Sequence, residues 1–106
     1  WSEWSNNYPF IVNGLNEVTN SKMYLQNYPN PFKNETKIEY LLTELTNVTL
    51  NIYAIDNRLI YSFYKPNQSN GKYIFNYKPI HLNPGVYFYE LITNNRLLTG
   101  KMIKSE

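Results

Sequence analysis

The side chains that most often perform chemistry are scarce in this sequence. The chain has a single histidine, His81, and no cysteine. Transition-metal sites are built from several histidine, cysteine or carboxylate ligands, so a lone histidine does not supply one. His81 precedes Leu82 in an expected loop, where an isolated histidine is best interpreted as a surface or packing residue. The sequence therefore predicts neither a metal ion nor a cofactor.

The acidic residues are the remaining candidates for catalysis. A glycosidase-type pair needs two carboxyl groups that face each other across a cleft. Glu90 is the most unusual acidic residue, because it lies within the apolar run 86–92, and we interpret it as edge-facing or salt-bridged. The four glycines do not form a phosphate-binding loop. The acidic residues fall mostly at turns or on polar faces of expected strands: Glu3, Glu17, Glu35, Glu39, Glu44, Asp56, Glu90 and Glu106. We therefore expect no enzymatic activity.

Composition is typical of a small folded domain without a nucleic-acid or membrane signature. The 106 residues suffice for one domain, and the aromatic content of 17% favours β-strands. The ten basic residues are scattered and the formal net charge is +2, so a nucleic-acid surface is not expected. No apolar run approaches the ~18 residues of a membrane span. No signal-peptide pattern follows Trp1, which suggests an internal or terminal piece of a longer protein.

The local pattern divides the chain into two parts. Residues 1–22 show no sustained period and contain Pro9 and Gly14, as expected for a linker or the end of an upstream cargo domain. From Met23 to Glu106, short runs of alternating apolar and polar residues are each closed by Pro, Gly, Asn or Asp. No stretch of ten or more residues has the 3.6-residue period of a helix. The sequence predicts one all-β domain over residues 23–106.

The number and spacing of the expected strands favour a seven-stranded immunoglobulin-like antiparallel β-sandwich. Asp56-Asn57 and Asn94-Asn95 are predicted to close tight hairpins, because both residue types tolerate positive φ. Residues 65–70 are expected to form a loop, and the run 86–92, apolar on both faces, a central strand. The predicted strands are Met23–Gln26, Thr36–Leu42, Asn47–Ile55, Arg58–Tyr64, Lys72–Tyr77, Val86–Ile92 and Arg96–Lys104. The predicted core includes Ile38, Tyr40, Val48, Leu50, Ile52, Phe75, Tyr87 and Leu91.

Five short motifs follow one another along these strands and turns. A Tyr-Pro-Asn-Pro-Phe segment at 28–32 precedes Val-Thr-Leu-Asn-Ile-Tyr at 48–53 and Gly71 at the start of a strand. Gly-Val-Tyr-Phe-Tyr at 85–89 comes next, and Lys-Met-Ile-Lys at 101–104 closes the series. In this order and spacing, the sequence from Met23 onward resembles the type A C-terminal sorting domain of the bacterial type IX secretion system.

The resemblance implies a non-catalytic secretion signal that follows an exported cargo protein. Such a domain passes the periplasm and directs its cargo through the outer membrane to the cell surface or the medium. The implied partners are the outer-membrane translocon and shuttle proteins of the system, and a sortase-like protease where the domain is removed. Sequence permissive for cleavage lies between Asn13 and Lys22. Neither nucleic acid nor a small-molecule substrate is implied. The residues expected to be recognised are Tyr28, Pro29, Asn30, Pro31, Phe32, Gly85, Val86, Tyr87, Lys101, Met102, Ile103, Lys104, Ser105 and Glu106.

The two prolines of the 28–32 segment are expected to end strand pairing. Pro29 and Pro31 have a fixed φ and no amide proton to donate. The ring of Phe32 is then expected to pack over the end of the sandwich. Gly85 is expected to adopt a backbone conformation that a side chain would disfavour, and so to lead the next strand into the core.

The polar residues at the C-terminal end are expected to contribute to recognition and not to folding. Residues 104–106 follow the apolar pair Met102-Ile103 and have no hydrophobic role, so we expect them to fray. Sorting domains of this family are read at their C-terminal end. A partner that pairs with the last strand would need residues 96–106 exposed and extended.

Two other functions are compatible with the sequence. A carbohydrate-binding accessory β-sandwich of a secreted enzyme would need two or three exposed, coplanar aromatic rings, for which Tyr53, Tyr64 and Tyr89 are the candidates. A structural immunoglobulin-like module of the hook-capping type also begins with a YPNPF-like segment. Binding of glucans or chitin would indicate the first function, and a position inside a longer protein would indicate the second.

Overall fold

The computed structural model describes residues 22–106, and each of the seven expected strands is present there. Of the predicted linker 1–22 and the cleavage region between Asn13 and Lys22, only Lys22 falls within the described residues. No helix occurs in this part of the chain. The strands are β1 (Tyr24–Tyr28), β2 (Thr36–Leu42), β3 (Thr46–Ala54), β4 (Leu59–Gln68), β5 (Gly71–Tyr77), β6 (Gly85–Ile92) and β7 (Leu97–Lys104).

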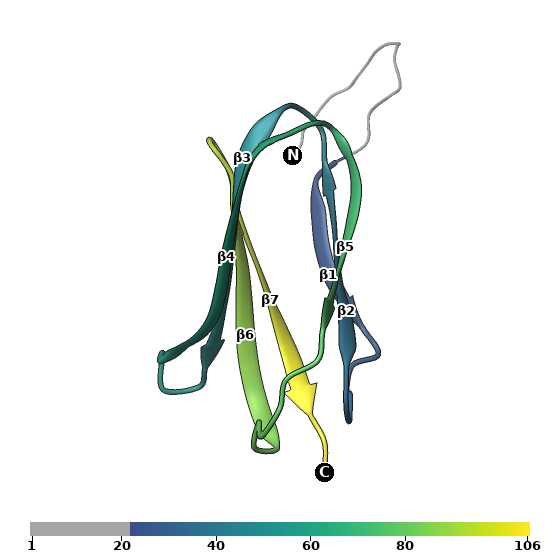
Figure 1. Cartoon of the computed structure of the whole chain (residues 1–106), viewed down its shortest axis with the longest axis vertical. Helices are drawn as coiled ribbons and strands as arrows, with labels where there is room; N and C mark the ends of the chain where they lie inside the picture. The colour runs from purple at the N-terminus through teal and green to yellow at the C-terminus, as the bar shows by residue number, and fades with distance from the viewer. Residues whose placement is uncertain (1–21) are drawn as a thin grey trace, which may run out of the picture.

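The strands form two antiparallel sheets that face each other (Figure 1). The smaller sheet has the order β1-β2-β5, and the larger sheet has the order β4-β3-β6-β7. β6 pairs with a strand on each side, so the prediction that residues 86–92 form a central strand is confirmed. The predicted all-β class is also confirmed. Each sheet has two edge strands, β1 and β5 in the smaller and β4 and β7 in the larger.

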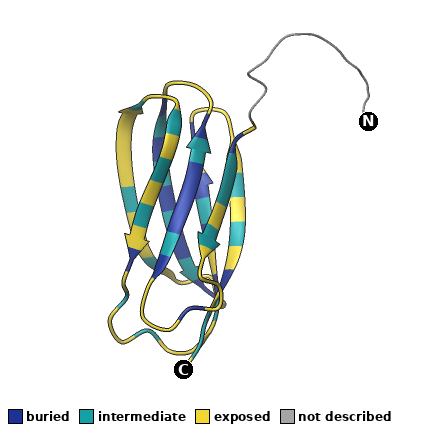
Figure 2. Ribbon diagram, turned by 90° about the vertical axis from the view of Figure 1, so that its right-hand side faces the viewer, coloured by how far each residue is buried: buried dark blue, intermediate teal, exposed yellow. Residues whose placement is uncertain are grey.

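The core lies between the sheets and follows from the alternation along the strands. In β3, every second residue from Thr46 to Ala54 is buried, and the residues between them are half-buried on the opposite face. Figure 2 shows the same alternation as bands along the ribbons. Every core position predicted from sequence is confirmed except Phe75, which is half-buried because β5 is an edge strand with no neighbour on one flank. The buried apolar residues are Met23, Phe32, Ile38, Tyr40, Leu42, Val48, Leu50, Ile52, Ala54, Tyr77, Tyr87, Tyr89, Leu91 and Met102.

β4 is longer than the sequence predicts. It continues through Pro66 to Gln68, where a loop is expected. The pairing of β3 with β4 changes register near Thr46, and the Asn67 amide donates to the side-chain oxygen of Asn47 (3.0 Å). A proline is tolerated here because β4 is an edge strand that needs no partner on its outer side.

The turns agree with the prediction more closely. Asn57, at the centre of the β3–β4 hairpin, has a φ of 69°, as its turn role requires. In the β6–β7 hairpin, the amide of Thr93 donates to the carbonyl oxygen of Arg96 (2.9 Å). β1 extends two residues beyond its expected end, because Tyr28 still pairs with Lys37 of β2.

The described part of the molecule is elongated, with a longest dimension of 49 Å. β1 begins near one end of the long axis, and the chain leaves β7 at the other end (Figure 1). The segment after β1, the β5–β6 connection and the residues after β7 all lie at this second end (Figure 1). The chain therefore enters the domain at one end and leaves it at the opposite one.

Candidate functional site

The structure brings the three predicted recognition segments together at one end of the molecule. In the β6–β7 pair, Gly85 lies opposite Lys104. The 28–32 segment contacts the other edge of β7, where Phe32 forms an isolated parallel bridge with Lys104. β7 thus has one recognition segment on each side. We call the surface formed by these residues the motif surface: Tyr28–Phe32, Gly85–Tyr87 and Lys101–Glu106.

Asn30 binds the edge of β7 through its side chain, in the manner of a neighbouring strand. Its Nδ2 atom donates to the carbonyl oxygen of Lys101 (3.0 Å), and its Oδ1 atom accepts from the amide of Ile103 (2.9 Å). Alternate residues of a strand direct their backbone groups to the same edge, so both bonds lie on the outer edge of β7. Pro29 and Pro31 have no amide proton to donate, and the asparagine side chain between them offers both a donor and an acceptor to β7.

Phe32 completes this contact and fixes the end of the chain. Its amide donates to the carbonyl oxygen of Ile103 (2.9 Å), and its carbonyl oxygen accepts from the amide (2.8 Å) and the hydroxyl (3.1 Å) of Ser105. Phe32 is 1% exposed, which confirms that its ring packs into the end of the domain. Pairing, expected to end in this segment, thus resumes after the prolines. The prediction that residues 104–106 fray is wrong for Lys104 and Ser105, because this bridge holds both.

A polar network supports the 28–32 segment from inside the domain. The hydroxyl of Tyr89, on β6, donates to Oδ1 of Asn27 on β1 (2.9 Å), and Nδ2 of Asn30 donates to the same oxygen (3.3 Å). Asn27 Nδ2 donates to the hydroxyl of Thr36 (3.1 Å), which donates to the carbonyl oxygen of Pro29 (3.0 Å). Burial raises the pKa of Tyr89 to about 12, so its hydroxyl remains a donor at neutral pH. The network ties the larger sheet to the smaller one directly behind Asn30.

Gly100 makes room for the tyrosine that anchors this network. A Cβ atom at position 100 would overlap the Tyr89 ring, so glycine allows that ring to cross β7 toward β1. The sequence does not reveal the roles of Gly100, Tyr89, Asn27 or Thr36, because their side chains meet from different strands. The one available signal is a glycine inside a strand, which often marks a close approach of other atoms.

Tyr28, at the start of the motif surface, is held by a carboxylate on the outer face of the smaller sheet. Glu39 of β2 is 6% exposed and accepts from the hydroxyls of Tyr28 (2.8 Å) and Tyr24 and from Nε2 of Gln26 (3.3 Å). The hydrogen bonds from Tyr24 and Tyr28, and then the charge of Lys72, hold the pKa of Glu39 below its ordinary value of 4.5. A carboxylate with this many donors can remain ionised although it is largely covered.

Glu39→Gln is expected to destabilise the domain at neutral pH and to change how its stability depends on pH. The folded-state pKa of Glu39 lies below the unfolded value, so the carboxylate contributes stability that is fully present above about pH 4.5. That stability is lost as the pH falls through the folded-state pKa. The difference in melting temperature between wild type and variant should therefore shrink below pH 4.5. Melting curves recorded from neutral pH downward measure it.

The matched control is Glu44→Gln, which removes an exposed carboxylate from the β2–β3 loop. Its melting temperature at neutral pH should stay close to that of the wild type, as for most surface changes. A Glu39→Gln deficit of the same size at every pH would contradict the assignment.

Gly85 and Tyr87 shape the start of β6. Gly85 has a φ of 150°, a conformation that side chains disfavour, which confirms its predicted backbone role. Tyr87 is buried, and its hydroxyl donates to the carbonyl oxygen of Asn83 (2.6 Å) in the preceding loop. These contacts fix the path by which the chain enters the motif surface.

Exposure separates the members of the motif surface that can touch a partner from those that support it. The buried members are Phe32, Tyr87 and Met102, and the half-buried ones are Val86, Lys104 and Ser105. The exposed members are Tyr28, Pro29, Asn30, Pro31, Gly85, Lys101, Ile103 and Glu106. The exposed members therefore offer a partner tyrosine, proline, asparagine, lysine and glutamate side chains and one isoleucine.

The other residues considered for chemistry do not form a site. Glu90 lies on the outer face of the central strand β6 and accepts from Nδ2 of Asn51 (3.3 Å) and from the hydroxyl of Tyr53 (3.1 Å). The prediction that it is edge-facing or salt-bridged is wrong, because β6 is paired on both sides and the donors to Glu90 are two neutral side chains of β3. Within residues 22–106, no three His, Cys, Asp or Glu side chains are grouped to hold a metal ion. The same residues include no helix that could cross a bilayer.

A known protein family matches most of the chain. The family model described as "Secretion system C-terminal sorting domain" matches residues 26–105. No curated protein matches the sequence significantly. Domains of this family are non-catalytic type IX secretion signals, and they imply interaction with that machinery and export toward the cell surface or the medium. The resemblance found from the motifs is confirmed, and the chain belongs to the family of secretion system C-terminal sorting domains.

Proposed function

We propose that this domain directs an exported cargo protein through the outer membrane, and that the motif surface is the part that the secretion machinery recognises. The supporting observation is spatial: three segments far apart in the sequence form one hydrogen-bonded unit at one end of the molecule. In this proposal the domain is an immunoglobulin-like sandwich that crosses the periplasm in transit. The outer-membrane translocon and its shuttle proteins contact the exposed members of the surface.

Packing does not account for several of those exposed members. Lys101, Ile103 and Glu106 are exposed and add nothing to the core. The chain enters β1 at the opposite end of the long axis (Figure 1). A cargo protein joined before residue 22 would therefore leave the motif surface uncovered. This geometry suits a signal that must be read while the cargo is attached.

A reporter fusion tests the proposal. Residues 1–106, fused behind a reporter with an export signal, should deliver it to the surface of a host that has the type IX system. The double variant Lys101→Glu/Ile103→Asp changes two exposed side chains of β7 and should retain the reporter in the periplasm. The matched control is Arg96→Glu/Leu97→Asp, which reverses one charge and replaces one exposed aliphatic side chain at the opposite end of the β6–β7 pair. This control should be delivered normally.

Two outcomes would contradict the proposal separately. Wild-type delivery of the Lys101→Glu/Ile103→Asp fusion would exclude these side chains as recognition elements. Periplasmic retention of the unaltered fusion, intact and folded, would contradict the sorting function itself. Melting curves of both purified double variants establish that each remains folded, so retention cannot be attributed to unfolding.

The three tyrosines considered for carbohydrate binding do not form an exposed platform. Tyr89 is 3% exposed and packs in the core, so its proposed role is wrong. Tyr53 is half-buried, and its hydroxyl is engaged with Glu90. Of the three candidates only Tyr64, at 59% exposure, is open to solvent, whereas a sugar platform needs two or three rings.

A further inference from the structure

A buried hydroxyl that belongs to none of the five sequence motifs lies directly behind the motif surface. Thr36 is the first residue of β2 and is 0% exposed. Its hydroxyl donates to the carbonyl oxygen of Pro29 (3.0 Å) and accepts from Nδ2 of Asn27 (3.1 Å). A threonine hydroxyl has a single hydrogen, so while that hydrogen is bonded to Pro29 the oxygen can only accept from Asn27.

This hydroxyl determines which way the Asn27 amide faces. The carbonyl oxygen of Pro29 cannot donate, so Thr36 must be the donor in the bond between them. Nδ2 of Asn27 then faces Thr36, and its Oδ1 atom faces the other way and accepts from Nδ2 of Asn30 (3.3 Å). The reversed amide would set oxygen against oxygen at Thr36 and NH2 against NH2 at Asn30. Tyr89 does not make this choice, because a tyrosine hydroxyl can donate or accept.

The same direction continues to the edge of β7. Nδ2 of Asn30 donates both to Oδ1 of Asn27 and to the carbonyl oxygen of Lys101 (3.0 Å). The Oδ1 atom of Asn30 is then left to accept from the amide of Ile103 (2.9 Å). Each hydrogen bond of the series has one allowed direction, and the Thr36 hydroxyl sets it. The series ends on side chains that are exposed, namely Asn30, Lys101 and Ile103.

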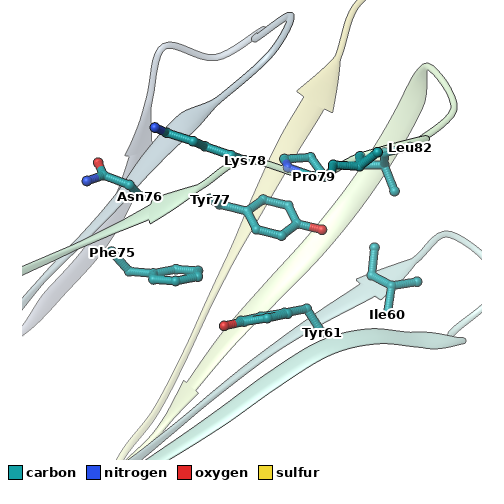
Figure 3. A pocket seen from close by; sticks show the side chains of 9 residues that line it. Ile60, Tyr61, Phe75, Asn76, Tyr77, Lys78, Pro79 and Leu82 are labelled. Atoms are coloured by element: carbon teal, nitrogen blue, oxygen red, sulfur yellow. The ribbon is translucent and has the colours of Figure 1, made fainter.

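This series of hydrogen bonds is separate from the open cleft between β4 and β5. The cleft has a volume of about 580 Å³ and is lined by residues of β4, β5 and the segment that follows β5 (Figure 3). Neither Asn27, Asn30 nor Thr36 is among them. Substitutions in the series therefore leave the lining of the cleft unchanged.

We propose that Thr36 is a positioning residue of the motif surface. Its buried hydroxyl keeps the Asn30 amide in the orientation that binds β7, and so holds the exposed side chains around Asn30 in place for the secretion machinery. Thr36 itself contacts no partner, since it is fully buried. The recognition part of this inference rests on the proposed function, whereas the positioning part is measured on the free domain.

Thr36→Val tests the positioning, because valine nearly matches the shape of threonine but has no hydroxyl. In the free 106-residue chain, hydrogen exchange at the Ile103 amide should become roughly two- to tenfold faster, since Asn30 leaves the edge of β7 more often. Thr36→Ser keeps the hydroxyl and should restore the slower exchange of the wild type.

The matched control is Thr46→Val, the same change at a threonine that is 4% exposed. The Thr46 hydroxyl donates to the carbonyl oxygen of Asn47 (3.1 Å) and accepts from the amide of Asn94 (3.0 Å). Asn94 follows the end of β6 that lies away from the motif surface. Thr46→Val should speed exchange at Asn94 and leave Ile103 unchanged, whereas Thr36→Val should do the reverse.

The reporter fusion tests the consequence for recognition. The Thr36→Val fusion should deliver several-fold less reporter to the cell surface than the wild type, and the Thr36→Ser and Thr46→Val fusions should deliver it normally. Unchanged exchange at Ile103 in Thr36→Val, or equal acceleration there in Thr46→Val, would overturn the positioning role. Normal delivery of Thr36→Val despite faster exchange at Ile103 would overturn its role in recognition. Retention of the unaltered fusion would contradict the sorting function instead, and the exchange rates would still decide the positioning.

Discussion

Replacing Phe32 by alanine is expected to lower the free energy of unfolding by about 3–5 kcal/mol, the usual cost of deleting a buried aromatic ring. Phe32 is 1% exposed and lies where the 28–32 segment meets β7. Small domains have a total stability of about 5–15 kcal/mol, so this single change removes a large part of it. Urea denaturation followed by aromatic fluorescence measures the loss.

Phe88→Ala is the matched control, because Phe88 is 39% exposed on the outer face of the larger sheet. Its loss of stability should be much smaller. The Phe32 variant should also speed hydrogen exchange at the amides of Ile103 and Ser105, since the ring holds their partner in place. Equal losses for the two phenylalanines, with unchanged exchange, would contradict the anchoring role.

Leu50→Ala should cost about 2–5 kcal/mol of unfolding free energy. Leu50 is fully buried in β3, a strand with hydrogen-bonded neighbours on both sides, so little relaxation can fill the resulting cavity. Denaturation curves at a fixed pH provide the measurement. The size of the effect reports directly on which face of β3 points inward.

Leu45→Ala makes the same chemical change at a residue that is 66% exposed. Its effect should stay within about 0.5 kcal/mol, as for most surface substitutions. The opposite ranking of the two leucines would mean that the register of β3 is shifted by one residue, because such a shift exchanges the two faces of a strand.

The strands and most of the core could be predicted because each strand carries its own signal. In β3, Val48, Leu50 and Ile52 alternate with polar residues, and this period of two fixes both the strand and its buried face. Asn57 and Gly85 occupy positions of positive φ, so residue type alone places the chain reversals near them. The order of the motifs then indicates the family.

The tertiary contacts of the motif surface could not be predicted in the same way. Terminal residues fray on average, but Ser105 is held by Phe32, a residue of the distant β1–β2 connection. Likewise Tyr89 reaches Asn27 across Gly100, which no local pattern encodes. Sheet order decides which edges meet, and hydrophobic periodicity contains no information about sheet order.

The contacts that join the 28–32 segment to β7 also determine when the motif surface can exist. Asn30 and Ile103, and likewise Phe32 and Ser105, are 73 residues apart in the sequence. Contacts with such separation form late, because the whole intervening chain must first be closed into a loop. During synthesis, the 28–32 segment emerges long before the strand that it binds. A chain that stops before residue 101 lacks the β7 part of this surface even if its other strands fold, so a receptor for the surface distinguishes chains that contain the end of β7 from chains that do not.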